Sequence, residues 1–221
     1  MNLVLFGPPG SGKGTQGQLL AARLNYRHVA TGTIIRTHIA KNTSFGRAVE
    51  QDIARGEFAP TNTMSELIKI ELTRCDPEDR WALDGFPRNI EQAYELLEWM
   101  KAGAFKQPLL VVSFALSSHA AAIRMAGRKT CAVCGTVYHM TSAPEQEQGY
   151  CDRGCGELSH RPEDDPESIV RRINIFETVT SPILAELFRA LPVATVDASL
   201  GIEPTYDMIT AHMRLHRMAR L

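Results

Sequence analysis

The sequence predicts an α/β fold in which five parallel strands form one sheet with helices on its faces. Short runs of continuously apolar, often β-branched residues recur along the chain, as is typical of strands buried on both faces. Stretches with helical periodicity lie between these runs. Because alternating strands and helices build parallel sheets, this fold class is expected. A glycine-rich turn at residues 7–12, directly after the first run, supports it.

The five expected strands are residues 3–6, 28–30, 81–84, 109–116 and 193–196. The expected helices are residues 13–24, 33–41, 45–55, 63–74, 90–102, 118–126, 167–190 and 205–218. Gly56 and Gly103 are suited to end two of these helices. Thr63 and Glu66 have the spacing of a capping box at a helix start. Pro182 is expected to kink or split the long helix, because proline lacks the N–H that a helix needs.

Two segments interrupt this alternation. Residues 31–59 place two or three helices between the second and third strands, which is more than one crossover needs. Residues 127–164 carry four cysteines and several glycines and prolines. Long insertions of this kind usually form lids or binding elements, so we expect both on the functional edge of the sheet. The core domain is then expected to comprise residues 1–30, 60–126 and 165–221.

Composition excludes several classes of protein. Of the 221 residues 44% are hydrophobic and 22% are charged, so most of the chain can bury a core and is not disordered. No apolar run approaches the roughly 20 residues that span a bilayer. The formal net charge of −1 argues against a nucleic-acid binder that relies on bulk charge. No basic stretch precedes the first apolar run, so no signal peptide is expected and the predicted location is the cytoplasm.

Residues 7–13, Gly-Pro-Pro-Gly-Ser-Gly-Lys, form the strongest motif. They follow an expected strand and open an expected helix. Glycines let backbone N–H groups approach a phosphate closely, and a helix start adds positive potential. Lys13 is expected to reach the outer phosphates of a nucleoside triphosphate, as in P-loop NTPases. The hydroxyl that usually follows this lysine comes one residue later, at Thr15 after Gly14, which weakens the prediction that it binds Mg²⁺ directly.

Asp84-Gly85-Phe86-Pro87-Arg88 ends the third expected strand. An acid at the carboxyl end of a strand beside a phosphate loop can hold Mg²⁺ or its water ligands. Gly85 permits close backbone approach, and Arg88 can clamp a second anionic group. The chain also has 18 Arg against 6 Lys, and a guanidinium group matches two phosphate oxygens at once. These features favour a site for phosphate groups.

The motifs together resemble those of the adenylate kinases, within the nucleoside monophosphate kinase family. The matching pieces occur in family order over nearly the whole chain. They are residues 7–15, Thr31-Gly32 with Arg36, residues 84–88 with Gln92, Arg124 with Gly127-Arg128, Arg161 and Arg172. The cysteine-bearing insertion resembles the lid of the bacterial long-form enzymes. The resemblance implies an ATP:AMP phosphotransferase (EC 2.7.4.3) that uses Mg²⁺, converts ATP and AMP to two ADP, and serves adenine nucleotide homeostasis and ADP synthesis by salvage.

The resemblance also implies roles for individual residues. Those expected around the transferring phosphoryl group are Lys13, Arg88, Arg128, Arg161 and Arg172. The acceptor oxygen is already anionic, so catalysis needs positioning and charge neutralisation rather than a general base. The residues expected to bind ATP are Gly10, Ser11, Gly12, Lys13, Gly14, Thr15, Arg124, Arg128, Tyr138, His139 and Leu200, with Asp84 beside Mg²⁺. Those expected to bind AMP are Thr31, Gly32, Arg36, Glu57, Phe58, Ala59, Gly85, Arg88, Gln92, Arg161 and Arg172.

Two residues favour AMP over a pyrimidine acceptor. By the same resemblance Gln92 reads the AMP base and Thr31 lies beside it, whereas the similar uridylate–cytidylate kinases tend to have Asn and Ala there. Arg36 and Arg88 would hold the AMP phosphate, and Arg124 would stack on the ATP adenine. GTP as the donor stays open, because donor-base contacts in the family are partly made by the backbone.

The sequence departs from the family at two places. Thr33 stands where many members have Asp, which usually joins the water network near Mg²⁺, so the metal is expected to be held more loosely. The Asp-Asp pair that usually follows the lid arginine corresponds to Glu163-Asp164, an alignment that keeps Arg172 in register. Alternatively, these acids and Asp165 form only a solvated acidic cluster at a helix start.

Two pairs of cysteines mark the second insertion. Without a secretion signal, paired thiols favour a metal, and their spacing suits a tetrahedral, structural Zn²⁺, with Fe²⁺ or Co²⁺ as alternatives. The predicted ligands are Cys131, Cys134, Cys151 and Cys155. The second pair is one residue wider than is usual in the family, so His139 or Asp152 could replace Cys155. A disulfide or a metal-free lid remains an alternative.

Two other functions compete with this reading. A P-loop switch protein predicts a single nucleotide site and explains neither Arg88 and Gln92 nor the insertion at 31–59. A nucleic-acid module on a zinc ribbon requires a basic, aromatic face, whereas residues 141–149 are rich in Glu and Gln. We therefore expect ATP, AMP and ADP as partners, no nucleic acid and no membrane. The chain is expected to be a monomer, since two mobile flaps fit poorly into an obligate interface, and Cys75 is expected to be a packed thiol.

Overall fold

The central sheet has five parallel strands, as the sequence predicts. The structure is a computed structural model that describes residues 1–74, 79–140 and 143–218. In spatial order the strands are β2 (Arg27–Ala30), β3 (Trp81–Asp84), β1 (Asn2–Phe6), β4 (Leu109–Ala115) and β8 (Val193–Asp197). All neighbouring strands pair in parallel, so their carboxyl ends meet at one edge. The phosphate loop follows β1, the central strand.

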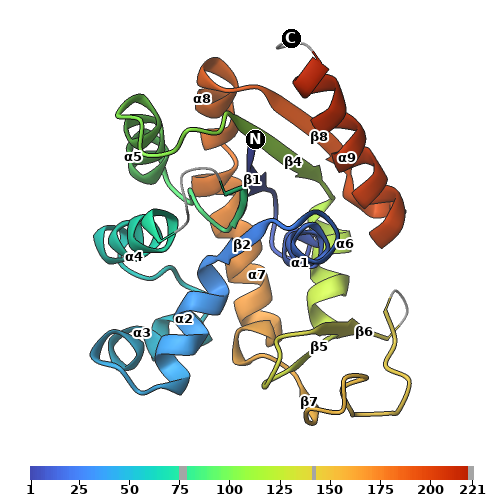
Figure 1. The fold of residues 1–221 in the computed structure, drawn as a ribbon. Helices are drawn as coiled ribbons and strands as arrows, with labels where there is room; N and C mark the ends of the chain where they lie inside the picture. Colours follow the sequence, from blue (N-terminus) through green and yellow to red (C-terminus); the bar gives the residue numbers. More distant parts are fainter. Residues whose placement is uncertain (75–78, 141–142, 219–221) are drawn as a thin grey trace.

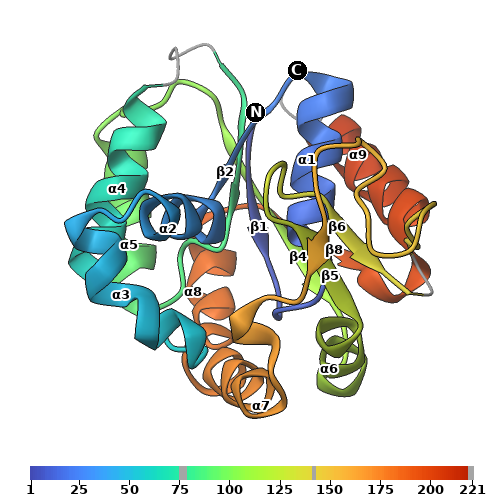
Figure 2. The ribbon, with the colours of Figure 1, turned by 90° about the horizontal axis from the view of Figure 1, so that it is seen from below.

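Alternate residues of the strands enter two separate hydrophobic cores. In β1, Val4 and Phe6 contribute to one core, and Leu3 and Leu5 to the other. The first core includes residues of α4 (Thr61–Thr73), α5 (Ile90–Lys101) and α8 (Ile183–Ala190). The second includes residues of α1 (Lys13–Leu24) and α9 (Ile202–Met218). Figures 1 and 2 show these helix sets on opposite sides of the sheet. Burial on both faces explains why the inner strands β1, β3 and β4 are almost continuously apolar, whereas the edge strands β2 and β8 are partly exposed and carry polar residues.

The first insertion folds as two helices, α2 (Thr31–Ala40) and α3 (Ser44–Ala54). α2 begins two residues earlier than expected, directly after β2. Thr43 caps α3 by accepting a hydrogen bond from the N–H of Gly46 at 3.0 Å. The capping box expected at residues 63–66 is wrong: α4 begins at Thr61 after Pro60, so this motif lies inside the helix. Pro60 stands at the N-cap with a φ of −52°, and within the described residues no side chain caps the start of this helix.

The predicted break at Pro182 is confirmed. The expected long helix divides into α7 (Pro166–Ile175), a π-helical turn at Phe176–Thr180, and α8. α9 starts at Ile202, three residues before the expected start, because the chain turns at Gly201, whose φ is +96°. α6 (Ser118–Ala126) begins after Ser117, whose hydroxyl accepts from the N–H of Ala120.

The second insertion contains a small antiparallel sheet that the sequence did not predict. Its order is β6 (Val137–His139), β5 (Arg128–Cys131) and β7 (Leu158–Ser159). The buried hydrophobic cluster of this unit consists of Cys131, Tyr138 and Cys151. Strands this short carry little periodicity, and their pairing depends on residues nearly 30 positions apart. Cys75 lies outside the described residues. Within the described ranges, no helix combines the length and apolar character needed to cross a membrane.

Candidate active site

A cavity of about 320 Å³ opens at the carboxyl ends of the parallel strands. This edge is where ligands bind in open parallel sheets. Most of the predicted nucleotide residues line it. They are Gly10, Ser11, Gly12, Lys13, Gly14, Thr15, Thr31, Gly32, Arg36, Glu57, Phe58, Asp84, Gly85, Arg88, Arg124, Arg128, Tyr138, His139, Arg161 and Arg172. Both insertions therefore contribute to one cavity with the core strands.

The phosphate loop has the backbone that its glycines predict. Gly12 has a φ of +88° and stands at the start of α1, and Gly10 has a φ of +79°. A Cβ on Gly10 would lie 2.7 Å from the carbonyl oxygen of Ala121, so only glycine fits there. Lys13 Nζ donates to the carbonyl oxygens of Gly7 at 2.8 Å and Pro8 at 2.7 Å. The ammonium group is therefore held inside the phosphate loop, where it is expected to contact the phosphates of a bound nucleotide.

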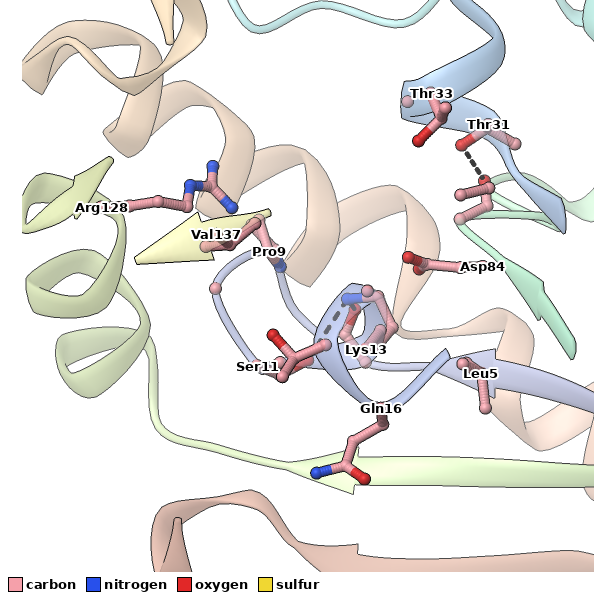
Figure 3. A pocket seen from close by; sticks show the side chains of 18 of the residues that line it. Leu5, Pro9, Ser11, Lys13, Gln16, Thr31, Thr33, Asp84, Arg128 and Val137 are labelled. Atoms are coloured by element: carbon pink, nitrogen blue, oxygen red, sulfur yellow. Dashed lines mark hydrogen bonds between the residues drawn. The ribbon is translucent and has the colours of Figure 1, made fainter. Parts of the chain in front are cut away.

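Asp84 points toward Lys13 across the cavity (Figure 3). Burial lowers the pKa of Lys13 to about 8, although the charge of Asp84 acts in the opposite direction. Burial alone would raise the pKa of Asp84, but His28 and the charge of Lys13 outweigh it and the pKa lies below its usual value. His28 Nε2 stands 3.8 Å from Asp84 Oδ2. The Asp84 carboxylate is thus ionised and available to a hard cation.

Acidic residues organise the guanidinium groups of the cavity. Asp164, whose side chain is fully buried, accepts two hydrogen bonds from Arg128, at 2.7 and 2.5 Å, and one from Arg172 at 2.8 Å. Glu163 accepts from Arg36 at 3.3 Å. The solvated-cluster alternative is therefore wrong for Asp164. It holds only for Asp165, which is exposed and caps α7 through the N–H groups of residues 167 and 168.

The clustered arginines carry more charge than their acids neutralise. Burial, and next the charge of Arg128, lowers the pKa of Arg161, while burial and then Arg172 lower that of Arg88. A guanidinium group stays protonated at neutral pH even so. The lowered pKa values instead express the free-energy cost of holding like charges together out of water, which a bound anion would relieve.

Arg88 occupies the end of the cavity that lies away from the phosphate loop. Its Nε donates to the carbonyl oxygen of Gly85 at 2.8 Å and its Nη2 to the Thr31 hydroxyl at 3.0 Å. Its guanidinium lies 5.0 Å from the ring centre of Phe58. The Gln92 side-chain oxygen accepts from the backbone N–H of Arg88 at 2.8 Å. A small adjoining cavity, lined by Ala59 and Gln92 among others, extends this end.

Leu200 is the one predicted ATP-binding residue that lines neither cavity. The residue is 53% exposed. Its neighbours Ala198, Gly201 and Ile202 form the lining instead, together with Arg124. Side-chain periodicity cannot reveal such a backbone surface, so the sequence pointed to the loop but not to the residues that face the cavity.

The four predicted cysteines come together in the second insertion. Their sulfur atoms all lie within 4.8 Å of one another. Sγ–Sγ distances are 3.6 Å for Cys131–Cys155, 3.6 Å for Cys134–Cys151 and 3.5 Å for Cys151–Cys155. A tetrahedral Zn²⁺ with bonds of about 2.3 Å requires sulfurs about 3.8 Å apart, so these residues fit a metal. Gly154, with a φ of +66°, turns the wider second loop so that Cys155 points inward.

The alternative fourth ligands make other contacts. Asp152 Oδ1 accepts from the backbone N–H of Gln146 at 2.9 Å. His139 pairs with Arg128 between β6 and β5, and a Cβ on Gly127 would lie 2.7 Å from its Nε2. Neither belongs to the group of potential ligands found among the described residues. The geometry therefore favours the set of four cysteines.

Sequence reasoning missed several residues that line the cavity, and four polar ones among them are His28, Gln16, Thr205 and Thr180. His28 stands in β2 beside Asp84, where Gly17 leaves room for its ring. Gln16 and Thr205 lie at the end of the cavity near Ala198. Thr180 donates to the carbonyl oxygen of Arg88 at 2.8 Å. None of them belongs to a local motif, although Gln16 directly follows the phosphate loop.

The fold and the site define a P-loop nucleotide-binding protein whose cavity is prepared for several phosphate groups. The adenylate kinase family model matches residues 5–190. The chain is 37% identical to an adenylate kinase of Anaeromyxobacter sp. (strain Fw109-5), covering 83% of this chain and 85% of the relative. It is 33% identical to one of Methanothrix thermoacetophila (95% and 97%) and 34% identical to one of Methanocella arvoryzae (97% and 97%).

The chain therefore belongs to the adenylate kinase family, whose activity is that of an ATP:AMP phosphotransferase. This membership favours the enzyme over the switch protein and the zinc-ribbon module. It also agrees with the resemblance found in the motifs.

Proposed function

We propose that the protein transfers the γ-phosphoryl group of ATP to AMP, reversibly and with Mg²⁺, to give two ADP. The charge of the cavity supports this most directly. Among the described residues that line it, seven are basic and three are acidic, an excess of four positive charges. The buried Asp164 behind the lining, which pairs with Arg128 and Arg172, reduces this excess to three. The basic residues are Lys13, Arg36, Arg88, Arg124, Arg128, Arg161 and Arg172, and the acidic ones are Glu57, Asp84 and Glu163. Such an excess suits two nucleotides whose phosphates meet.

In this proposal the two nucleotides enter from opposite ends. ATP would lie on the phosphate loop, with its base near Arg124 and the backbone around Gly201. AMP would lie against Thr31 and the backbone of residues 57–59, with its base near Gln92. The groups that would surround the phosphoryl group between them are Lys13, Arg88, Arg128, Arg161 and Arg172. The enzyme would serve the balance and the salvage synthesis of adenine nucleotides.

Catalysis would rest on positioning and charge. An AMP phosphate oxygen is anionic at neutral pH, so it attacks without a general base. Arg88 would hold it in line with the γ-phosphorus, and Lys13 would neutralise charge on the donor side. Asp84, kept ionised by its neighbours, is an oxygen ligand suited to Mg²⁺ or its waters. When bound, Mg²⁺ supplies further charge neutralisation. Thr33 lines the same cavity with a neutral hydroxyl, and we propose that this loosens metal binding.

We also propose that residues 31–59 and 127–164 close over the nucleotides as domains distinct from the core. Closure keeps water from the γ-phosphoryl group, which would otherwise be hydrolysed. Contacts between α7 and the first insertion support a coupling, since Ser168 Oγ donates to the carbonyl oxygen of Ala54 at 3.0 Å. A monomer in the cytoplasm fits two such flaps and a cluster of reduced thiols.

The direct test is ADP formation from ATP and AMP, compared with ATP alone. We expect rapid ADP production only when both nucleotides and Mg²⁺ are present. Equal consumption of ATP without AMP would show an ATPase instead. A compound that joins two adenosines through a chain of phosphates should inhibit at low concentration, because it would span both ends of the cavity.

The affinity for ATP is expected to fall above about pH 8. Lys13 of the free protein loses its proton there, whereas phosphates beside it would keep it charged in the complex. The complex then binds more protons than the free protein, so binding weakens as pH rises, by up to about tenfold per pH unit. Calorimetric titration with ATP at pH 7, 8 and 9 measures this, and proton uptake at pH 9 should appear as a dependence on buffer ionisation enthalpy. A pH-independent Kd would contradict the role of Lys13.

We propose that the four cysteines hold one structural Zn²⁺ per chain, with Fe²⁺ or Co²⁺ as alternatives. Hydrogen bonds involving Thr136 outweigh the effect of burial and lower the pKa of Cys134 to about 6, which favours the thiolate that a metal needs. Removal of the metal is expected to lower Tm by about 5–10 °C, because the insertion has little core of its own. Metal analysis and thermal unfolding before and after chelation measure this.

At low temperature, removal of the metal should reduce the rate of ADP formation only slightly, although it lowers Tm. None of the four cysteines lines the cavity, and only nearby residues such as Gly135 do. Adding Zn²⁺ back should restore Tm. Cys155→Ser should reduce the bound metal and reproduce the lower Tm without chelator. No shift of Tm on chelation would rule out a structural metal.

A further inference from the structure

The loop between β8 and α9 contributes three residues to the lining of the cavity. A 3₁₀ turn at Ala198–Leu200 follows β8, and Gly201 leads into α9. Ala198, Gly201 and Ile202 line the cavity, whereas Leu200 does not. Alanine and glycine have almost no side chain, so the surface they offer is mostly backbone N–H and C=O groups. Such groups can distinguish the edge of one base from another only if they are held in place.

Gln16 holds this loop from the core. Its side-chain Nε2 donates to the carbonyl oxygen of Ile202 at 2.8 Å, joining residues 186 positions apart. Gln16 is only 2% exposed, and it lies in α1 directly behind the phosphate loop. In Figure 3 its side chain points away from Lys13 and Ser11, so it does not serve the phosphates. Its Oε1 is buried without a hydrogen-bond partner among the described residues. An unpaired buried acceptor lowers the stability of the folded protein, so the amide is not there for stability alone.

Thr205 holds the same loop from the other side. Its hydroxyl lies 2.6 Å from the carbonyl oxygen of Gly201 and 3.2 Å from that of Asp197, and its residue is 3% exposed. The Asp197 carboxylate in turn accepts from the N–H of Ser199 at 2.8 Å. Side chains from α1, β8 and α9 therefore restrain this loop at both of its ends and at Ser199.

We propose that Gln16 and Thr205 are positioning residues that set the affinity and base selectivity for the phosphoryl donor. This rests on the proposed function, in which the donor base lies at this end of the cavity. Neither side chain is assigned a contact with substrate; both act through the main chain of residues 198–202. Because α1 starts at the phosphate loop, Gln16 also fixes the distance between the site for the phosphates and the surface that meets the base.

The test compares Gln16→Leu and Thr205→Val with the wild-type protein. One lost hydrogen bond corresponds to about fivefold in affinity, so KM and Kd for ATP should rise about fivefold in each variant. The kcat should change less than about twofold, and KM for AMP should stay the same. ITP carries an oxygen where ATP carries an amino group, so the preference for ATP over ITP should fall at least about threefold as the loop loosens.

Two further variants separate positioning from general damage. Thr205→Ser keeps the hydroxyl and should restore ATP affinity and selectivity. Gln51→Leu makes the same change at an exposed position of α3 and should alter nothing. Unchanged ATP affinity and ATP/ITP preference in Gln16→Leu and Thr205→Val would overturn the proposal, as would an equal rise in KM for AMP. Calorimetry with ATP and ITP needs no turnover, so failure of this proposal is distinguishable from a wild-type protein that makes no ADP.

Discussion

Lys13→Met is expected to lower kcat at least about 1000-fold. Lys13 is the basic residue held inside the phosphate loop, 2.8 and 2.7 Å from two of its carbonyl oxygens. Methionine has a similar length but no charge, so it removes the neutralisation of the donor phosphates and leaves the packing. Steady-state rates of ADP formation measure the loss.

The same substitution is expected to leave Tm unchanged or raise it. Burial lowers the pKa of Lys13, which means that the folded protein holds this charge at a cost. Lys69→Met, an exposed lysine on α4, is the matched control and should keep full activity. If Lys13→Met unfolds the protein, or if it keeps more than about a tenth of the activity, the assigned role is wrong.

Arg88→Ala is expected to lower kcat by about 100- to 1000-fold and to weaken AMP binding at least about tenfold. The Arg88 guanidinium is fixed at the end of the cavity proposed for AMP, since it donates to the Gly85 carbonyl oxygen and the Thr31 hydroxyl and lies over the Phe58 ring. Rate measurements with varied AMP and calorimetric titration with AMP separate the two effects.

Two control variants accompany this prediction: one keeps the positive charge at position 88, and the other removes an arginine outside the site. Arg88→Lys keeps a positive charge but loses the planar fork, so it should recover only part of the AMP affinity. Arg214→Ala, an exposed arginine on α9, should behave as wild type. An Arg88→Ala protein that binds AMP with unchanged affinity would contradict the role proposed for Arg88.

Local motifs predicted two segments that lie together at the carboxyl edge of the sheet. The phosphate loop and the segment from Asp84 to Arg88 line one cavity, as their places after β1 and β3 imply. The Glu163-Asp164 alignment is supported too, because Asp164 contacts Arg172 directly. The capping box predicted at residues 63–66 is wrong, since α4 already begins at Thr61 after Pro60. His28 and Thr205 could not be found, because their roles come from contacts across the fold.

The sequence by itself determined the parallel sheet, the phosphate loop and the family to which this chain belongs. These depend on periodicity, glycine placement and short spacings, which act over a few residues and do not require knowledge of the tertiary contacts. The tertiary structure alone decided that Arg128 and Arg172 share Asp164, that Cys155 joins the other three sulfurs, and that Gln16 reaches Ile202. Such contacts join residues far apart in the chain, and their energies depend on burial and distance, which exist only once the chain has folded.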